Sequence, residues 1–510
     1  MKTLLPFLAF IFLLSSCRSQ PLEPDQDRSL PGPLGTATST NTPISTKPPE
    51  PGIISVDSCG ADPWDDQPDS EAIQQCIDQA KSGDTVLFTS GVNQSGYQGY
   101  LIDKTIFLVL NYAKDNLLFT ATDPTDYPLL QATDDLKGFV VSLVARSRVS
   151  IYGKVDNITI SNLQIDGNQE NRICNGHDAV ENGLDDSWGS WLVGECSHGL
   201  CDAGTLSMCG ASDLGDVQQN YQGNPDAWST GLTVDNVYIT NTECATALSL
   251  CGAASKIVNT TIDTAGDKPL YQACESTDPD EPEADWSDGI TFEGPDHIIT
   301  GNTIIDATDV GIVFFGGRNT TISNNTVKAT EGNHGMFAAI AIHPWGWGDV
   351  SGLEITNNTV INEASARCGG IHAGINIGTH MWDGGCVGAA DKVSVGNPNH
   401  CSAEPSPPQG TLCKQGNPCQ IWAYVAAGET LTLTDNYVAG AQINYLVEGL
   451  DLLGIFIDSG NVSVEPRYTD WVDDAGCGMG GMNDRWGAFD FVAHHPTLPG
   501  WTDKRVHCAY

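Results

Sequence analysis

The chain has 510 residues, which is enough for one large domain or for two to three ordinary ones. Asp and Glu number 64 against 23 Lys and Arg, so the formal net charge is −41 at pH 7. Such a charge excludes nucleic acid as an expected partner, and it disfavours a polyanionic glycan unless Ca²⁺ bridges the two.

The first residues predict an export signal. Residues 1–17 carry Lys2 and then an apolar run from Leu4 to Leu14, which is too short to span a bilayer. The ending "LLSSC" resembles a bacterial lipobox, and this resemblance implies cleavage before Cys17 and a lipid on its sulfur. We therefore expect an extracytoplasmic lipoprotein on the cell membrane or outer surface, with the lipid as its only membrane contact. An ordinary secretory signal with an incidental Cys17 is the alternative.

The next segment and the cysteine count fit an exported protein. Residues 18–52 are rich in Pro, Ser and Thr, a composition that cannot bury a core and predicts an extended tether. The chain has 17 Cys, so 16 remain without Cys17, an even number that suits disulfides in an oxidising compartment. Metal binding is the competing use of these cysteines, but no paired CxxC supports it.

Short alternating strands recur along residues 53–470, as in "VDNITISNLQIDGN", "DHIITGNTIIDAT" and "RNTTISNNTVKAT". Asn302 and Asn325 are 23 residues apart, and Ile290 and Ile312 are 22 apart. This period predicts a parallel β-solenoid whose coils stack to bury their apolar faces. Asn recurs at one position, where it would tolerate a left-handed turn or bond the same Asn one coil away, at residues 162, 241, 302, 325, 358 and 436. Residues 471–510 leave the repeat and are expected to cap the last coil.

The start of the body resembles the N-terminal segment of pectate-lyase-like right-handed β-helix proteins, in the stretch "SVDSCGADPWDDQPDSEAIQQCIDQAKSGDTVLF". The resemblance implies an all-β, right-handed parallel β-helix with an N-terminal capping helix that covers the open first coil. The apolar face of that helix is expected to contain Ala72, Ile73, Cys76, Ile77 and Ala80. A Cys59–Cys76 bridge is expected with it. Two long Cys-containing insertions, 169–228 and 379–420, are expected to protrude and wall a groove.

Acidic residues stand at the start of successive strands. Aligning apolar pairs places "DGI" at 288–290 over "VGI" at 310–312, and "HGM" at 334–336 is a further candidate for the same column. The order resembles polygalacturonase-type glycoside hydrolases, with N-T-D-G, D-D, G-H-G and R-x-K in turn. The resemblance implies that Asp288, Asp309, His334 and Arg367 stand at the corresponding positions.

The motif also departs from the family. Val310 replaces the second acid of the pair, and Gly369 stands where a Lys is usual, which puts water activation and galacturonate recognition in doubt. Glycoside hydrolysis needs a protonated acid and a carboxylate, and acids on neighbouring coils lie about 5 Å apart along the axis. Asp309 is expected as the acid and Asp288 as its partner, with His334 tuning the pair or binding substrate. The alternative is that these residues only cap turns.

A second group of residues lies near strand ends. Trp345 and Trp347 could stack on sugar rings, or they could anchor loops on the solenoid wall. Glu293 and His343 are predicted at equivalent strand ends and form the second-choice pair. No cofactor is expected to be required, although the acidic loop 275–288 offers oxygen ligands that would suit Ca²⁺.

Three functions therefore remain open. The first is a surface-anchored glycoside hydrolase that cleaves a polysaccharide with paired carboxylates. The second is a β-eliminating polysaccharide lyase, which ranks lower because Arg318 and Lys328 fall away from the acidic column. The third is a non-catalytic solenoid that binds glycans. In each case we expect a monomer.

Overall fold

A computed structural model describes most of residues 51–465. The described ranges are 51–92, 94–109, 114–136, 139–144, 155–172, 205–209, 229–242, 245–266, 287–331, 335–343, 349–364, 370–377, 411–413, 419–421, 423–441, 443–447, 450–452 and 454–465. The chain divides into two units, Met1–Glu50 and Pro51–Tyr510, and every described residue belongs to the second. The predicted lipid site Cys17, the tether and the C-terminal cap at 471–510 lie outside the described residues, apart from residues 51 and 52.

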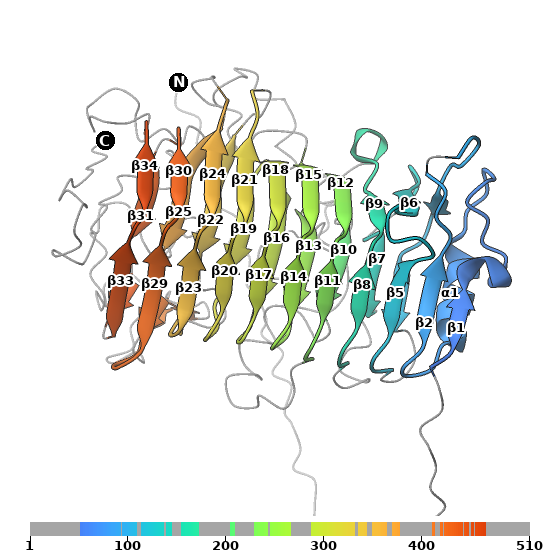
Figure 1. The fold of residues 1–510 in the computed structure, drawn as a ribbon, viewed down its shortest axis with the longest axis horizontal. Helices are drawn as coiled ribbons and strands as arrows, with labels where there is room; N and C mark the ends of the chain where they lie inside the picture. The colour runs from blue at the N-terminus through green and yellow to red at the C-terminus, as the bar shows by residue number, and fades with distance from the viewer. Residues whose placement is uncertain are drawn as a thin grey trace, which may run out of the picture. The chain divides into compact units, whose positions relative to one another are not determined.

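Three long parallel sheets form the body, and most coils of the chain contribute one strand to each sheet (Figure 1). The eleven-stranded sheet contains β1 (Ile53–Ser55), β2 (Thr85–Phe88), β5 (Leu118–Ala121), β8 (Thr159–Ser161), β11 (Thr233–Asp235), β14 (Lys256–Val258), β17 (Ile298–Thr300), β20 (Thr321–Ser323), β23 (Leu353–Thr356), β29 (Thr430–Thr434) and β33 (Ile455–Ser459). The ten-stranded sheet contains β3 (Tyr100–Ile102), β6 (Leu129–Ala132), β9 (Gln164–Asp166), β12 (Tyr238–Thr242), β15 (Thr261–Ala265), β18 (Thr303–Ala307), β21 (Thr326–Ala329), β24 (Thr359–Asn362), β30 (Tyr437–Ala439) and β34 (Val462–Val464).

The nine-stranded sheet carries the residues of most interest here. Its strands are β4 (Ile106–Val109), β7 (Val141–Val144), β10 (Leu206–Cys209), β13 (Ala245–Cys251), β16 (Ser287–Glu293), β19 (Val310–Phe314), β22 (Met336–Ile342), β25 (Ile371–Ile377) and β31 (Ile443–Val447). Two small sheets join β26 (Thr411–Cys413) to β27 (Cys419–Ile421) and β28 (Ala423–Val425) to β32 (Leu450–Leu452). The expected all-β parallel solenoid is confirmed. No helix among the described residues is long and apolar enough to cross a membrane.

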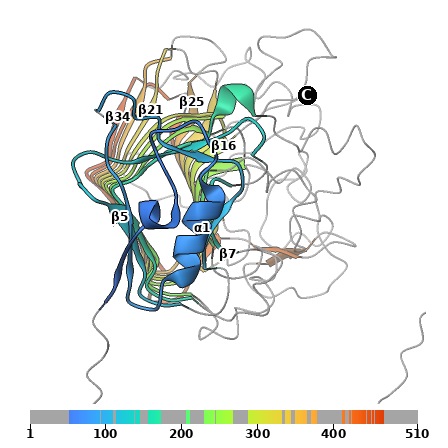
Figure 2. The same cartoon turned by 90° about the vertical axis from the view of Figure 1, so that its right-hand side faces the viewer.

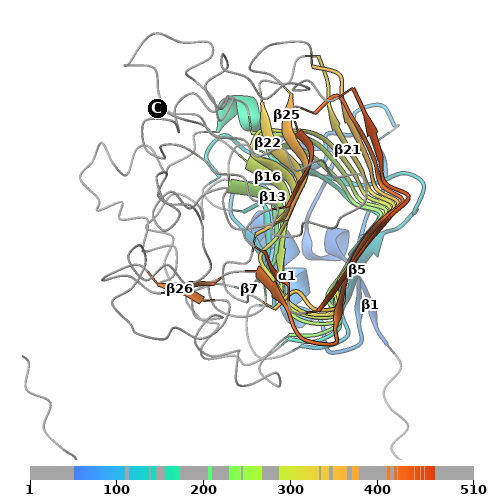
Figure 3. The same ribbon diagram turned by 90° about the vertical axis from the view of Figure 1, so that its left-hand side faces the viewer.

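The core is a stack of identical apolar positions. Ile290, Ile312, Ile340 and Ile375 are register partners on four successive strands of the nine-stranded sheet, and all are buried. Viewed along the stack, β13, β16, β22 and β25 lie one behind another (Figure 3). Since one coil alone cannot bury such side chains, stacking is what removes them from water.

A helix closes the first coil, as predicted (Figure 2). α1 (Ser70–Gln79) buries Ile73 and Ile77, and Gln74 on the same helix exchanges two hydrogen bonds with the backbone of Phe107 on β4. This amide occupies the edge of β4 in the way that a neighbouring strand would, which protects the edge from pairing with another chain. Ala80 is buried but follows the helix in an extended conformation, so the helix ends one residue earlier than its apolar pattern indicated.

The N-terminal region contains one further confirmed prediction. Cys59, the last residue of the 3₁₀ turn η1 (Val56–Cys59), forms a disulfide with Cys76 of α1. The bridge ties the helix to the turn after β1. A second 3₁₀ turn, η3 (Gln169–Asn171), follows β9.

The recurring asparagines divide into two structural roles. Asn302, Asn325, Asn358, Asn436 and Asn461 form a ladder in which each side-chain amide donates to the side-chain oxygen of the next, at 2.9–3.0 Å. The first four of them are buried. None of these five has positive φ, because the preceding residue takes the left-handed turn, as at Asn324 and Asn357. By contrast, Asn162 and Asn241 are themselves left-handed. The sequence pattern grouped both kinds together.

Candidate active site

The register of β16 and β19 fixes the position of the predicted acids. Ile290 pairs with Ile312, so Asp288 lies beside Val310, and the predicted alignment of 288–290 with 310–312 is confirmed. The predicted alignment of "HGM" with these segments is wrong. Val310 pairs with Ala338, so 338–340 takes the place expected for 334–336.

Asp288 faces away from the core because two successive residues after it face inward. A Cβ built on Gly289 would meet Ile304 Cγ2 at 2.7 Å and the carbonyl oxygen of Gly311 at 2.5 Å, so position 289 faces the core. Ile290 is also a core residue. The interruption of strict alternation places Asp288 and Thr291 together on the outer face, where Thr291 Oγ1 donates to Asp288 Oδ2 at 2.8 Å.

The Asp288 carboxyl is held by two donors in a buried environment. Val310 N donates to Oδ1 at 3.1 Å, and only 7% of the residue is exposed. Burial raises the pKa of Asp288 to about 7, although the hydrogen bonds from Thr291 and Val310 act in the opposite direction. A carboxyl group in this state can hold a proton near neutral pH and release it, as a general acid must.

The backbone of Asp309 lies beside the Asp288 carboxyl. Its N–H donates to the carbonyl oxygen of Ser287 at 3.1 Å, and the peptide that joins Asp309 to Val310 supplies the donor to Asp288. Asp309 is fully buried. One strand spacing across and one residue along separate the Cα atoms of Asp288 and Asp309 by roughly 6 Å.

Glu293 ends the same strand, on the same outer face. It is 1% exposed, and burial raises the pKa of Glu293 to about 8. Its Oε1 has no hydrogen-bond partner among the described residues. A buried oxygen without a partner favours the protonated form of the carboxyl.

Glu293 and His343 occupy equivalent strand-end positions, as predicted, but they are not neighbours. The register of Phe292, Phe314 and Ile342 places Glu293, Phe315 and His343 in one column. Two strand spacings separate Glu293 from His343 by roughly 10 Å along the solenoid, too far for direct contact. Phe315 occupies the register position between them, and its ring meets the His343 ring edge-on, with centroids 6.4 Å apart.

Sequence reasoning missed the hydroxyl groups around Asp288. Thr246 on β13 is the register partner of Asp288, and its Oγ1 lies 3.0 Å from Thr291 Oγ1. A signal was present in the sequence. Each strand of this region has a small residue followed by Leu or Ile, which marks two inward positions and so identifies the outward residues on either side, in Ala247–Leu248, Gly289–Ile290, Gly311–Ile312, Ala339–Ile340 and Gly374–Ile375.

Four of the predicted site residues lie outside the described residues, namely His334, Arg367, Trp345 and Trp347. Most of the acidic loop 275–288 also lies outside them. Within the described part of the chain, no group of three or more His, Cys, Asp or Glu side chains could hold a metal ion.

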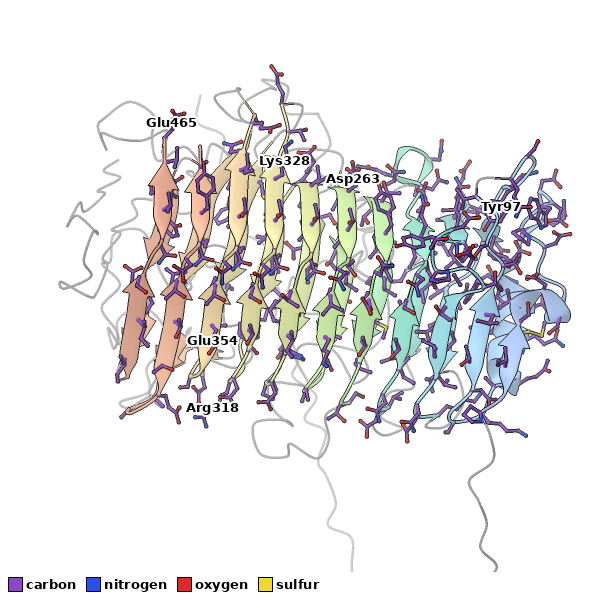
Figure 4. The ribbon with its side chains drawn as sticks, viewed as in Figure 1. Tyr97, Asp263, Arg318, Lys328, Glu354 and Glu465 are labelled. Atoms are coloured by element: carbon purple, nitrogen blue, oxygen red, sulfur yellow. A yellow bond between two sulfur atoms is a disulfide. The ribbon has the colours of Figure 1, made fainter. Side chains whose placement is uncertain are left out.

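The two basic side chains considered for lyase chemistry, Arg318 and Lys328, form ion pairs away from Asp288. Arg318 pairs with Asp349 at 3.3 Å and with Glu429 at 3.0 Å, and Lys328 on β21 pairs with Glu363 at 2.8 Å. Figure 4 shows Arg318 beyond the lower ends of the strands and Lys328 on the ten-stranded sheet. Neither belongs to a strand of the nine-stranded sheet that carries Asp288.

Comparison with known proteins supports the fold. Residues 224–381 match the family model described as the right handed beta helix region, which includes β16, β19 and β22, and the expected right-handed parallel β-helix is confirmed. No curated protein sequence matches the chain.

Solved structures resemble the chain only distantly. They include the endo-xylogalacturonan hydrolase from Aspergillus tubingensis, at 14% identity and a TM-score of 0.37 over 81% of this chain and 93% of that one. The alginate lyase from Paenibacillus sp. is 12% identical, with a TM-score of 0.33 over 64% and 91%. The surface adhesin PfbA of Streptococcus pneumoniae is 13% identical, with a TM-score of 0.32 over 80% and 91%. Because a fold can host many functions, any assignment of function depends on the site itself.

Proposed function

We propose that this pectate-lyase-like, right-handed parallel β-helix protein is a polysaccharide hydrolase whose proton donor is a carboxyl on the outer face of the nine-stranded sheet. The observation that carries the proposal is the state of Asp288. It is an outward-facing carboxyl, held by Thr291 and Val310, whose pKa burial raises to about 7. A carboxyl that only caps a turn works best in its charged form, because the charged form accepts hydrogen bonds better. A buried site that favours the protonated form does not serve that purpose.

The roles differ from those expected from the sequence. Asp288 is the proton donor to the leaving oxygen, because it remains protonated up to about neutral pH. Asp309, on the adjacent coil, is the second carboxyl, which acts on water or on the sugar carbon. Glu293 is five residues along the strand from Asp288, roughly 16 Å between Cα atoms if fully extended, and binds substrate instead of forming the pair.

A lyase is less well supported. Elimination beside a uronate calls for a basic side chain at the site, and Arg318 and Lys328 are in ion pairs away from the nine-stranded sheet. Surface attachment through a lipidated Cys17 is part of the same proposal, because a tethered hydrolase would act on polymers outside the cell. Mass spectrometry of the processed N-terminus would test that attachment.

The activity test uses the full-length protein with neutral and acidic polysaccharides. Reducing-sugar release is measured for wild type and for Asp288→Asn and Asp309→Asn, and absorbance near 235 nm reports unsaturated products. Asp263→Asn is the matched control, because Asp263 lies on the ten-stranded sheet and bonds the Tyr238 hydroxyl (Figure 4).

The proposal expects reducing sugar without that absorbance, a loss of about 10²-fold or more in Asp288→Asn and Asp309→Asn, and full activity in the control. Full activity in both site variants would sink the assignment of these acids. Product absorbance would replace the hydrolase by a lyase. Binding of a glycan without any turnover would favour a non-catalytic solenoid.

A further inference from the structure

Three consecutive coils carry a polar residue at the same place, the corner where the chain passes from the nine-stranded to the eleven-stranded sheet. Ser255, His297 and Thr320 each stand one residue before a strand of the eleven-stranded sheet, and the register of β14, β17 and β20 places them in one column. All three are fully buried. We refer to them as the corner column.

The two hydroxyl members show what this position does. Ser255 Oγ accepts a hydrogen bond from Leu232 N of the preceding coil at 3.2 Å and donates to the carbonyl oxygen of Ala253 in its own corner at 2.9 Å. Thr320 Oγ1 accepts from His297 N of the preceding coil at 3.4 Å and donates within its own corner in the same way. Each hydroxyl therefore joins two coils, because it accepts a backbone N–H of one and donates to a backbone carbonyl of the other.

His297 makes the same two connections with its imidazole ring. Ser255 N donates to Nδ1 at 3.3 Å, and Nε2 lies 2.9 Å from the carbonyl oxygen of Glu293 in the same corner as the ring. A backbone N–H can only donate and a carbonyl oxygen can only accept, so the ring is neutral and carries its proton on Nε2. The ring also meets Phe292 edge-on, with centroids 5.8 Å apart, and a Cβ on Gly294 would lie 3.1 Å from Nε2. The corner is thus closely fitted to a neutral imidazole.

A proton on the ring would undo this fit. A hydroxyl accepts and donates at every pH, but an imidazole loses its acceptor when Nδ1 takes up a proton. Nδ1–H would then face the N–H of Ser255, and a positive charge would lie in a fully buried site. Burial accordingly lowers the pKa of His297, while the Glu293 carbonyl and the charge of Asp296 act in the opposite direction.

The charged groups of these corners do not remove that cost. Asp296, beside His297, accepts from Asn319 Nδ2 at 3.1 Å and is exposed, so water screens its charge. The Glu293 carboxyl, at the end of β16, is protonated below about pH 8. The flanking corners contribute the exposed Lys256 and Arg318, which is held in two ion pairs, and both are cations that disfavour a second positive charge.

We propose that His297 is an acid-sensitive lock on the corner between β16 and β17. The neutral ring ties this corner to the preceding coil through Ser255, and a proton on Nδ1 breaks the tie and releases the corner. Because β16 carries Asp288 and Glu293, acid would loosen the strand of the candidate site first, while the coils joined by hydroxyls keep their contacts. The lock belongs to the scaffold, so it acts whether or not the protein hydrolyses a polysaccharide.

Urea unfolding at about pH 7 and about pH 5 compares wild type with His297→Asn, whose amide oxygen can accept from Ser255 N at either pH. The Asn variant loses the packing of the ring at both pH values, so the diagnostic quantity is the change between them. Thr320→Ser is the matched control, because it keeps a hydroxyl in the corner column one coil away. Titration of the other buried groups is common to all three proteins and cancels.

The expected result follows from the lowered pKa of His297. Its contribution to stability is complete above 6.5, the ordinary pKa of the unfolded chain, and is lost as the pH falls below that value. From pH 7 to pH 5 the equilibrium constant for unfolding of wild type should therefore rise about 10- to 25-fold relative to that of His297→Asn, and the control should follow wild type. A relative rise below about 3-fold would overturn the role of His297.

Hydrogen–deuterium exchange of wild type gives a second measurement that does not require any variant to fold. After correction for the intrinsic pH dependence of exchange, peptides that contain Ser255 or residues 294–298 should lose protection at about pH 5. A peptide from 321–327, on the next coil, should keep its protection. Unchanged protection around Ser255 would refute the lock, and an equal loss in all three peptides would replace a local release by global unfolding.

Discussion

The free energy of unfolding of wild type should fall as the pH rises, because Glu293 loses its proton. Replacing Glu293 by Gln should remove this part of the pH dependence. The pKa of Glu293 is raised from 4.5 to about 8 in the folded chain, so the folded state holds the proton more tightly than the unfolded state does. Its contribution to stability is complete below 4.5 and is lost as the pH rises through about 8. The difference between these two pKa values corresponds to about 5 kcal/mol, of which about 3 kcal/mol is lost by pH 7.

Urea unfolding of both proteins at about pH 5 and about pH 9, followed by far-ultraviolet circular dichroism, measures this difference. The Gln variant buries an amide of its own, so the diagnostic quantity is the change in the free-energy difference between the two pH values. The contribution of Asp288 to the free energy of unfolding is lost in an overlapping pH range. Because Asp288 is present in both proteins, this loss cancels in the comparison. Glu354→Gln, at an exposed position on β23 labelled in Figure 4, should follow wild type at both pH values. An identical pH dependence in wild type and Glu293→Gln would refute the assignment of a buried, protonated Glu293.

Three further predictions follow from other parts of the site and the scaffold. The kcat/KM of wild type should fall as the pH rises through about 7, because Asp288 then loses the proton it donates; a rate that keeps rising above this pH would contradict its role. Asn358→Ala should lower the free energy of unfolding by about 2–6 kcal/mol, because the buried N–H of Asn325 and a core carbonyl lose their partner, and urea denaturation would show it. Phe292→Ala should cost about 3–5 kcal/mol in the same assay, since Phe292 is fully buried in the stack, and a cost below about 1 kcal/mol would argue against that packing.

Much of the scaffold could be predicted because its causes are local. Alternating β-formers, a turn residue and a fixed period are each readable in the sequence, and they gave the correct pairing of Ile290 with Ile312 and of Asn302 with Asn325. The capping helix and its disulfide were equally predictable, since an amphipathic helix beside an open sheet edge buries its apolar face by covering that edge.

The site was predicted less well, because it depends on departures from the period. Asp288 and Val310 are 22 residues apart, but Val310 and its next partner Ala338 are 28 apart, so counting from one coil to the next led to the wrong segment. The outward direction of Asp288 depends on Gly289 and Ile290 both facing inward, which simple alternation does not foresee. The raised pKa values of Asp288 and Glu293 result from burial, which sequence alone does not report.

The asparagine ladder has a consequence for how this architecture can change. Successive ladder residues are 23, 33, 78 and 25 positions apart in the chain, yet the amide contacts between them are nearly the same. Coil registration is therefore fixed at one corner of the solenoid, whatever the length of chain that separates two corners. The chain between Asn358 and Asn436 is the longest of these connections, and it keeps the same amide contact as the shortest one. The ladder thus uncouples the scaffold from its insertions, which leaves these insertions free to diversify and makes them the natural places to graft new binding segments.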